Sequence, residues 1–154
     1  MRMSEAHTPP TDAERDACAR AFARIALSAG QAIMEVYAGD CASRQKADAS
    51  PVTEADERAE AIILARLSAM FPQTPVVAEE SVARGSVPAC GVRFILVDPM
   101  DGTREFLARN GEFTVNIALI DAGAAVAGAV YAPALARLWF GGATGWSCEA
   151  APGE

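Results

Sequence analysis

The chain has 154 residues, of which 51% are hydrophobic, and its formal net charge is −7 at pH 7. This length and composition predict one folded domain with a sizeable core, and they exclude a disordered chain. The negative charge argues against a nucleic-acid polymer as partner, and no apolar run is long enough for a membrane span. A phosphate substrate would be repelled unless bound cations reversed the charge locally.

The first ten residues are polar, contain two prolines and lack the apolar segment of a signal peptide. We expect residues 1–10 to be a disordered arm of a cytoplasmic protein, followed by a single domain over residues 11–154. His7, the only histidine, lies in this arm, which argues against histidine acid–base chemistry and histidine-ligated zinc. The cysteines are scattered without a Cys-x-x-Cys pair, which favours reduced thiols: Cys18, Cys41, Cys90 and Cys148.

A long amphipathic helix is predicted next. It begins at a capping box, in which Thr11 caps the helix and Glu14, three residues later, reaches back to the cap. Apolar residues then recur at steps of three and four as far as Val36, until Gly39-Asp40 ends the helix. This apolar stripe is interpreted as ordinary core.

Residues 41–52 are polar and turn-prone, and a second helix is predicted from Thr53 to Pro72, which cannot continue it. Asp56 lies in the first turn of this helix and has two interpretations. It could accept hydrogen bonds from the cap and interact with the positive helix end. Alternatively, it could be a functional carboxylate.

A short strand over residues 75–78 is predicted, and the paired acids Glu79 and Glu80 follow it directly. Paired acids at a strand end are usually solvated surface. The other interpretation is a ligand arm for a cation site. Residues 82–91 are expected to form a loop.

The apolar run at residues 94–97 predicts a buried strand. Asp98 follows it, and Pro99 cannot donate to a sheet ladder, so the strand is expected to end there. Gly102 permits a tight turn or close approach of the backbone to a ligand. Asp98 and Asp101 thus predict a two-carboxylate cradle for a hard cation such as Mg²⁺.

Beyond the cradle, residues 103–109 could form a short helix. Three strands are then predicted over residues 113–121, 124–131 and 138–140, separated by turns at Gly123 and Pro133. They form an antiparallel meander, and no further helix follows that could cover it.

Three separated segments resemble, in the same order, the lithium-sensitive, magnesium-dependent phosphatases of the inositol monophosphatase superfamily. Residues 98–103, Asp-Pro-Met-Asp-Gly-Thr, resemble its Asp-Pro-x-Asp-Gly-Thr signature. Residues 46–56, 77–81 and 101–120 resemble the CysQ-type 3′(2′),5′-bisphosphate nucleotidases in particular. The resemblance extends from about Asp12 to about Trp146.

The resemblance implies roles for individual residues. Glu79 would bind the first of two or three Mg²⁺ ions, Asp98 would bridge two ions, and Asp101 would hold the second. The backbone carbonyl of Met100 would be a further ligand. Thr103 together with Asp56 would orient and deprotonate the attacking water. The implied substrate-binding residues are Glu79, Met100, Asp101, Gly102 and Thr103.

The resemblance also implies a fold and an activity. The fold would be α+β, an inositol-phosphatase-like layered sandwich with two long helices packed on a mainly antiparallel sheet. The activity would be Mg²⁺-dependent hydrolysis of 3′(2′)-phosphoadenosine 5′-phosphate to AMP and phosphate, linked to sulfate assimilation. Alternatives within the superfamily are inositol monophosphate or a sugar phosphate as substrate. The resemblance allows a homodimer, and a peripheral location at the inner face of the cell membrane as an alternative to free cytoplasm.

The spacing of the acids disfavours one rival class. Phosphatases with a nucleophilic aspartate carry Asp-x-Asp-Gly-Thr, with the acids two residues apart, whereas Asp98 and Asp101 are three apart. We therefore do not expect an aspartyl-phosphate mechanism.

The sequence departs from the family in one respect. Family members continue into a second half with a Trp-Asp-x-Ala-Ala motif, whose aspartate completes the second metal site. Here Ser147 stands in the aspartate position after Trp146, and we assign Trp146 to the meander. We therefore expect that the C-terminal α/β half is missing and that the chain alone has little or no activity. The non-enzymatic alternative is a truncated relic or a metal-binding half that needs a partner.

Overall fold

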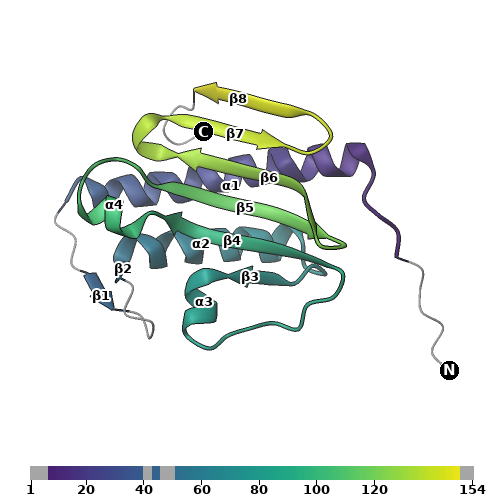
Figure 1. The fold of residues 1–154 in the computed structure, drawn as a ribbon, viewed down its shortest axis with the longest axis horizontal. Helices are drawn as coiled ribbons and strands as arrows, with labels where there is room; N and C mark the ends of the chain where they lie inside the picture. The colour runs from purple at the N-terminus through teal and green to yellow at the C-terminus, as the bar shows by residue number, and fades with distance from the viewer. Residues whose placement is uncertain (1–6, 40–42, 46–50, 150–154) are drawn as a thin grey trace.

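A computed structural model describes residues 7–39, 43–45 and 51–149. In this part of the chain, two long helices pack on one face of a six-stranded sheet (Figure 1). The helices are α1 (Asp12–Tyr37), α2 (Glu54–Met70), α3 (Glu79–Ala83), α4 (Thr103–Leu107) and the 3₁₀ turn η1 (Pro133–Leu135). The strands are β1 (Ser43–Gln45), β2 (Pro51–Thr53), β3 (Val76–Ala78), β4 (Arg93–Asp101), β5 (Thr114–Asp121), β6 (Ala124–Ala132), β7 (Arg137–Gly141) and β8 (Gly145–Glu149).

The strands of the main sheet follow the chain in the order β3-β4-β5-β6-β7-β8. β3 and β4 are parallel, and every later neighbouring pair is antiparallel. β1 and β2 form a separate antiparallel pair. The predicted α+β class, with two long helices on a mainly antiparallel sheet, is therefore confirmed.

Both long helices begin at capping boxes, as the sequence predicts. Thr11 accepts a hydrogen bond from the backbone N–H of Glu14, and the Glu14 carboxylate accepts one from Thr11 N. Thr53 and Asp56 repeat this arrangement at the start of α2. These reciprocal bonds satisfy backbone donors that a helix end otherwise leaves without partners.

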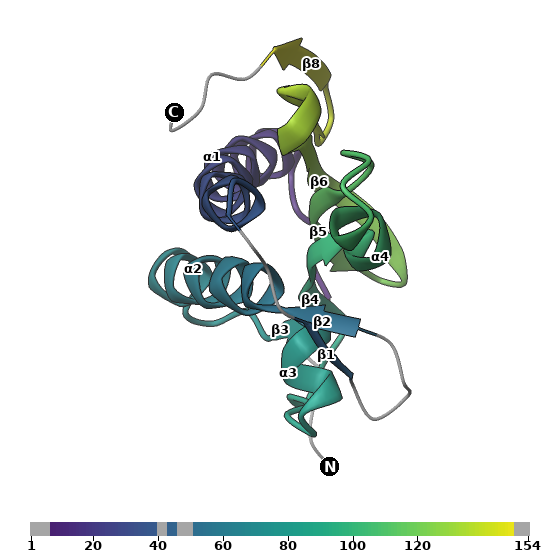
Figure 2. The same ribbon diagram turned by 90° about the vertical axis from the view of Figure 1, so that its left-hand side faces the viewer.

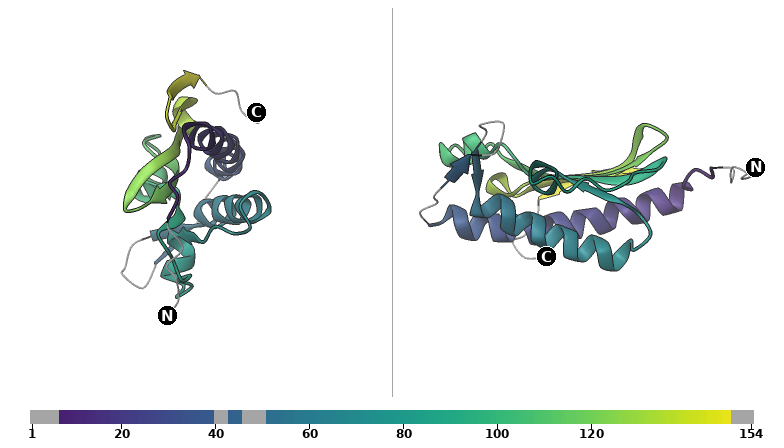
Figure 3. Two further views of the ribbon diagram at one scale, coloured as in Figure 1. Left: turned by 90° about the vertical axis from the view of Figure 1, so that its right-hand side faces the viewer. Right: turned by 90° about the horizontal axis from the view of Figure 1, so that it is seen from below.

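The core lies between the helices and one face of the sheet (Figures 2 and 3). β5 shows how the sequence produces this, since its residues alternate strictly between buried and half-buried. Val115, Ile117 and Leu119 face the helices. Phe22 and Ile33 of α1 are completely buried against them.

Two element boundaries and one additional helix differ from the sequence prediction. β4 does not end before Pro99, as expected, but continues to Asp101. The residues after β3 form the short helix α3, which was not predicted. The predicted helix over residues 103–109 ends at Leu107. As predicted, Trp146 belongs to the meander, because it lies in β8 and pairs with Phe140 of β7.

The segment before α1 has defined contacts in the described residues. His7 Nε2 lies 2.9 Å from Asp121 Oδ2, and Arg93 Nε donates to the other oxygen of Asp121 at 2.7 Å. Arg93 also donates to the carbonyl of Thr8 at 2.8 Å. Residues 7 and 8 of the expected arm are thus attached to the sheet where β4 begins and β5 ends, while residues 1–6 lie outside the described residues.

Among the helices of the described residues, none has both the length and the apolar composition that crossing a membrane requires. Three cysteines fall in the described part, and all three are free thiols: Cys18, Cys90 and Cys148. Cys41 lies outside it.

Candidate functional site

The parallel pairing of β3 and β4 brings two acidic residues together. Val77 lies opposite Leu96 and Ala78 opposite Val97, so the next residues, Glu79 at the start of α3 and Asp98 within β4, lie side by side. Their carboxyl groups are hydrogen-bonded to each other. The second interpretation of Glu79, as an arm beside Asp98, therefore matches the geometry.

A β-bulge decides where Asp101 points. Asp98 pairs with Asn116 and Asp101 with Thr114, so Pro99 and Met100 together stand opposite the single residue Val115. In a regular strand, residues three apart face opposite sides. The extra residue of the bulge cancels one alternation and puts both aspartates on one face. Thr114 and Asn116 confirm this, because Asn116 Nδ2 donates to Thr114 Oγ1 at 3.1 Å.

Burial and the two neighbouring acids disfavour the ionised form of Asp98. Burial raises the pKa of Asp98 to about 8, and the hydrogen bond with Glu79 and the charges of Glu79 and Asp101 act in the same direction. The Met100 N–H, which donates to Asp98 Oδ1 at 3.2 Å, opposes the rise. A cation at this position would remove the repulsion and favour the ionised form of Asp98.

The donor set agrees with Mg²⁺ in chemistry, since it consists of hard carboxylate and carbonyl oxygens. In the part of the chain that the structure describes, however, no three acidic, histidine or cysteine side chains form a group that could hold a metal ion. Glu79 and Asp98 are instead a contacting pair, with Asp101 near enough to affect Asp98. A bound ion would need further ligands besides these two side chains.

Gly102 turns the chain from β4 into α4. Its φ is +97°, and a Cβ there would lie 2.7 Å from the carbonyl oxygen of Glu112. Only glycine fits both the left-handed backbone and this close approach. The turn makes Thr103 the first residue of α4, and its Oγ1 lies 3.5 Å from the carbonyl oxygen of Met100.

Asp56 caps α2, as its first interpretation predicts, and it also contacts Thr103. Its Oδ2 accepts hydrogen bonds from Thr53 N at 2.8 Å and from Thr53 Oγ1 at 2.6 Å, as a helix cap does. Its Oδ1 accepts a hydrogen bond from Thr103 Oγ1 at 2.8 Å. Asp56 is completely buried. The predicted pair of Asp56 and Thr103 is therefore in direct contact.

All seven residues predicted for the site gather at one end of the sheet, near α3, α4 and β2 (Figure 1). They are Asp56, Glu79, Asp98, Met100, Asp101 and Thr103, with Gly102 as the turn between the last two. Lys46 and Asp48, quoted for the family resemblance, lie outside the described residues. Sequence reasoning missed Glu60, which is buried on α2, and Asn116, which lies beside Asp98. The spacing of Glu60 from Asp56, one helical turn, was the available signal.

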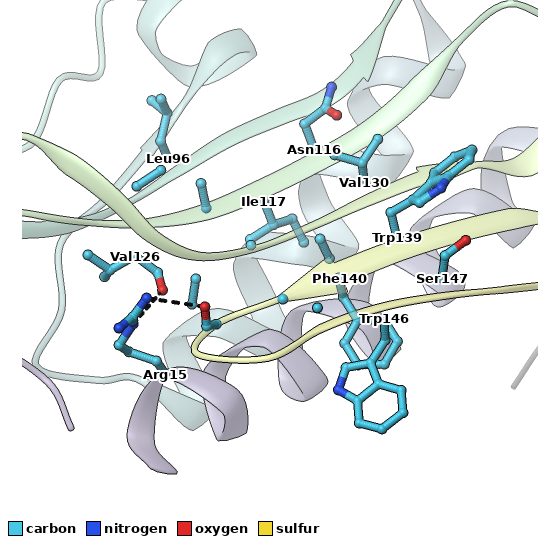
Figure 4. Close-up of a pocket in the computed structure, with 18 of the residues that line it drawn as sticks. Arg15, Leu96, Asn116, Ile117, Val126, Val130, Trp139, Phe140, Trp146 and Ser147 are labelled. Carbon is cyan, nitrogen blue, oxygen red and sulfur yellow. Dashed lines mark hydrogen bonds between the residues drawn. The ribbon is translucent and has the colours of Figure 1, made fainter. Parts of the chain in front are cut away.

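An open groove of about 740 Å³ begins at Asp98 and Asn116 and continues along the sheet to β7 and β8 (Figure 4). Two exposed tryptophans line its far end from opposite faces of the sheet. Trp146, 58% exposed, pairs with Phe140 on the side of the long helices, and Trp139, 41% exposed, lies on the other face. Leu96 and Val130 are also exposed on the face of Trp139, so this face carries apolar side chains at the surface.

Comparison with known proteins gives a consistent result. The model of the inositol monophosphatase family matches residues 14–149. The chain is 48% identical over 119 residues to the 3′(2′),5′-bisphosphate nucleotidase CysQ of Salmonella typhimurium, and 50% identical over 116 residues to that of Escherichia coli K12. These matches cover 76% and 73% of this chain but 48% and 46% of the relatives. The chain thus spans about half the length of the curated relatives it matches.

Solved structures agree. CysQ from Bacteroides thetaiotaomicron has a TM-score of 0.71 at 36% identity, with 90% of this chain and 51% of that chain covered. The extragenic suppressor protein suhB from Bartonella henselae has a TM-score of 0.74 at 30% identity, with 88% and 53% covered. With the matched motifs, the shared fold and the family model taken together, the chain belongs to the inositol monophosphatase family.

Proposed function

We propose that this chain carries the acidic, metal-binding half of a Mg²⁺-dependent phosphomonoesterase that hydrolyses 3′(2′)-phosphoadenosine 5′-phosphate to AMP and phosphate. The observation that carries the proposal is the hydrogen bond from Thr103 Oγ1 to Asp56 Oδ1, formed beside the acids at the ends of β3 and β4. The identity of 48–50% to curated bisphosphate nucleotidases supports this substrate.

Thr103 and Asp56 form a proton relay in this proposal. The Thr103 hydroxyl already donates to Asp56, so its oxygen is left to accept a hydrogen bond from a water molecule. As the water attacks phosphorus, its proton passes to Thr103 Oγ1 while the hydroxyl proton passes to Asp56 Oδ1. The phosphorus–oxygen ester bond breaks, and solvent water protonates the leaving oxygen. The two bonds from Thr53 to Oδ2 keep the other carboxylate oxygen occupied.

The carboxylates of Glu79, Asp98 and Asp101 and the Met100 carbonyl would hold the magnesium ions, two or three in number. When bound, Mg²⁺ supplies Lewis-acid activation of water and neutralises phosphate charge. Gly102 has no side chain, so the backbone at Gly102 and Thr103 can lie against the phosphate group. The remaining task of these residues is to position water and ester for in-line attack.

The test is phosphate release with Mg²⁺ from 3′-phosphoadenosine 5′-phosphate and, separately, from inositol 1-phosphate. The chain is assayed alone and together with the part of the Escherichia coli relative that it does not match. We expect little or no release by the chain alone, and release by the combination with preference for the nucleotide. Preference for inositol 1-phosphate would instead favour the alternative substrate class.

Matched variants test the relay in the active combination. Thr103→Ser keeps the hydroxyl, whereas Thr103→Val keeps only the shape. Because general-base assistance contributes about 10²–10⁴-fold, we expect Thr103→Val to lose at least about 10²-fold in kcat and Thr103→Ser far less. Equal activity of the two variants would rule out the relay.

A second candidate function is a non-catalytic, metal-binding half that needs a partner chain. The exposed apolar side chains of Leu96, Val130 and Trp139 on the sheet face away from the long helices favour it. Titration calorimetry distinguishes the candidates. Mg²⁺ binding without turnover under any of the assay conditions would support this candidate, and turnover would eliminate it.

A further inference from the structure

Glu60 is a buried carboxylate in the middle of α2, and it is only 1% exposed. Within the described residues its side chain accepts four hydrogen bonds, all from the segment that follows β3. Oε2 accepts from the backbone N–H groups of Glu80 at 2.8 Å and Ser81 at 3.3 Å. Oε1 accepts from Ser81 Oγ at 2.6 Å and Arg84 Nη2 at 2.9 Å. Both oxygens are therefore used to hold one turn of chain.

The turn formed by α3 needs support from outside its own residues. α3 has five residues, and helices this short gain too few internal bonds to offset their nucleation cost. The first N–H groups of any helix lack partners within the helix. Ala78, at the N-cap position of α3, has no side-chain oxygen to accept from them. Glu60 supplies that oxygen from another helix.

The position of the turn decides the position of Glu79. Glu79 lies between the last residue of β3 and the two amides that Glu60 binds. Its backbone is thus restrained on one side by the pairing of β3 with β4 and on the other by Glu60. The exposed Glu79 side chain is in this way kept beside Asp98.

α2 therefore supports both the segment that follows β3 and the segment that follows β4. Asp56 binds Thr103, which follows β4, and Glu60, one helical turn later, binds the segment that follows β3. We propose that Glu60 is a positioning residue that sets the geometry of the Glu79–Asp98 pair for a divalent cation. The cation part of this inference rests on the proposed function.

The experiment compares the wild-type chain with Glu60→Gln, using Mn²⁺ as the probe and electron paramagnetic resonance to measure binding. Glutamine has nearly the same shape but brings an uncharged amide against Arg84. Because residues that orient a metal ligand contribute about 10–100-fold to metal affinity, we expect Glu60→Gln to bind Mn²⁺ at least about 10-fold more weakly. Glu54→Gln is the matched control, since it removes the same charge from an exposed site of the same helix, and less than about 2-fold change is expected.

A second measurement follows the turn itself. Hydrogen exchange of the Glu80 and Ser81 amides should accelerate in Glu60→Gln, while that of Phe106, bonded to the Gly102 carbonyl, should stay unchanged. A merely structural role of Glu60 would lower stability without changing the Mn²⁺ affinity of the folded chain. Unchanged affinity in Glu60→Gln would therefore overturn the proposal.

The failure of the proposed function is distinguishable from the failure of this inference. If the wild-type chain binds no Mn²⁺, the proposed metal-binding function is contradicted. The positioning role is then decided by the exchange data alone: faster exchange of Glu80 and Ser81 in Glu60→Gln but not in Glu54→Gln supports it, and unchanged exchange overturns it.

Discussion

Thr103 Oγ1 donates a hydrogen bond of 2.8 Å to Asp56 Oδ1, although the two residues are 47 positions apart in the chain. The bond joins the first turn of α2 to the first residue of α4. Since the other oxygen of Asp56 accepts two bonds from Thr53, one carboxylate both caps a helix and aligns a hydroxyl at the candidate site. A single side chain therefore connects the start of α2 with the start of α4.

The first prediction concerns Asp56. In Asp56→Asn, an amide N–H₂ must replace one carboxylate oxygen, so either the Thr53 N–H or the Thr103 hydroxyl loses its acceptor inside the protein. We expect a loss of about 1–3 kcal/mol in the free energy of unfolding, measured by urea denaturation. Asp12→Asn is the control, because Asp12 lies in the first turn of α1 but is 81% exposed. A loss no larger than that of Asp12→Asn would contradict the double role of Asp56.

The second prediction separates two contributions to the loss of stability when Gly102 is replaced, namely backbone strain and a steric clash. Gly102→Ala forces a side chain into a left-handed backbone and brings its Cβ to 2.7 Å from Glu112 O, whereas Gly123→Ala meets nothing within 4 Å at a φ of +81°. We expect Gly123→Ala to cost about 1 kcal/mol and Gly102→Ala roughly 1–3 kcal/mol more. Thermal or urea unfolding of both variants measures the difference. Equal losses would show that the backbone at Gly102 relaxes away from Glu112.

The third prediction is a dependence of stability on pH. The pKa of Asp98 is about 8 in the folded chain, with burial as the largest cause, and near 3.8 when unfolded. The folded state therefore binds more protons between these values, and the contribution of Asp98 to stability falls as pH rises from about 4 to about 8. Because the group is only half-buried, solvent screening reduces the effect to about 1 kcal/mol.

Asp98→Asn tests this assignment. In chelator-treated samples, this variant should lose less stability than the wild type between pH 5 and pH 8, and it should be the more stable of the two at pH 8. Urea denaturation at several pH values provides the measurement. Parallel curves for the two proteins would mean that Asp98 does not titrate in this range.

The fourth prediction concerns Mg²⁺ and the folded chain. A ligand that binds only the folded state at 100 times its dissociation constant stabilises that state by about 2.7 kcal/mol. We expect Mg²⁺ to raise the Tm of the wild-type chain, and Glu79→Gln to reduce the rise. Glu35→Gln, on the exposed face of α1, should respond to Mg²⁺ as the wild type does. An equal rise in all three proteins would indicate binding elsewhere.

Local patterns were sufficient to predict the capping boxes at Thr11 and Thr53, the two long helices and the meander after Gly102. The candidate residues followed from the family resemblance, because local patterns alone favoured a purely structural interpretation of Asp56 and Glu79. Local patterns failed at Pro99, which lacks the N–H for a ladder bond but is tolerated where β4 forms a bulge. They also did not single out Glu60, because a glutamate on a helix is normally interpreted as an exposed polar residue, whereas Glu60 is buried.

The sequence by itself determined which residues are candidates for the site and where the two long helices begin, since caps, apolar periods and turn residues act over a few positions. Only the tertiary structure decided how those residues meet. The parallel register of β3 and β4 puts Glu79 beside Asp98, the bulge turns Asp101 to the same face, and α2 joins both turns through Asp56 and Glu60. Strand register and helix docking are set by packing between segments far apart in the chain, and no local pattern encodes them.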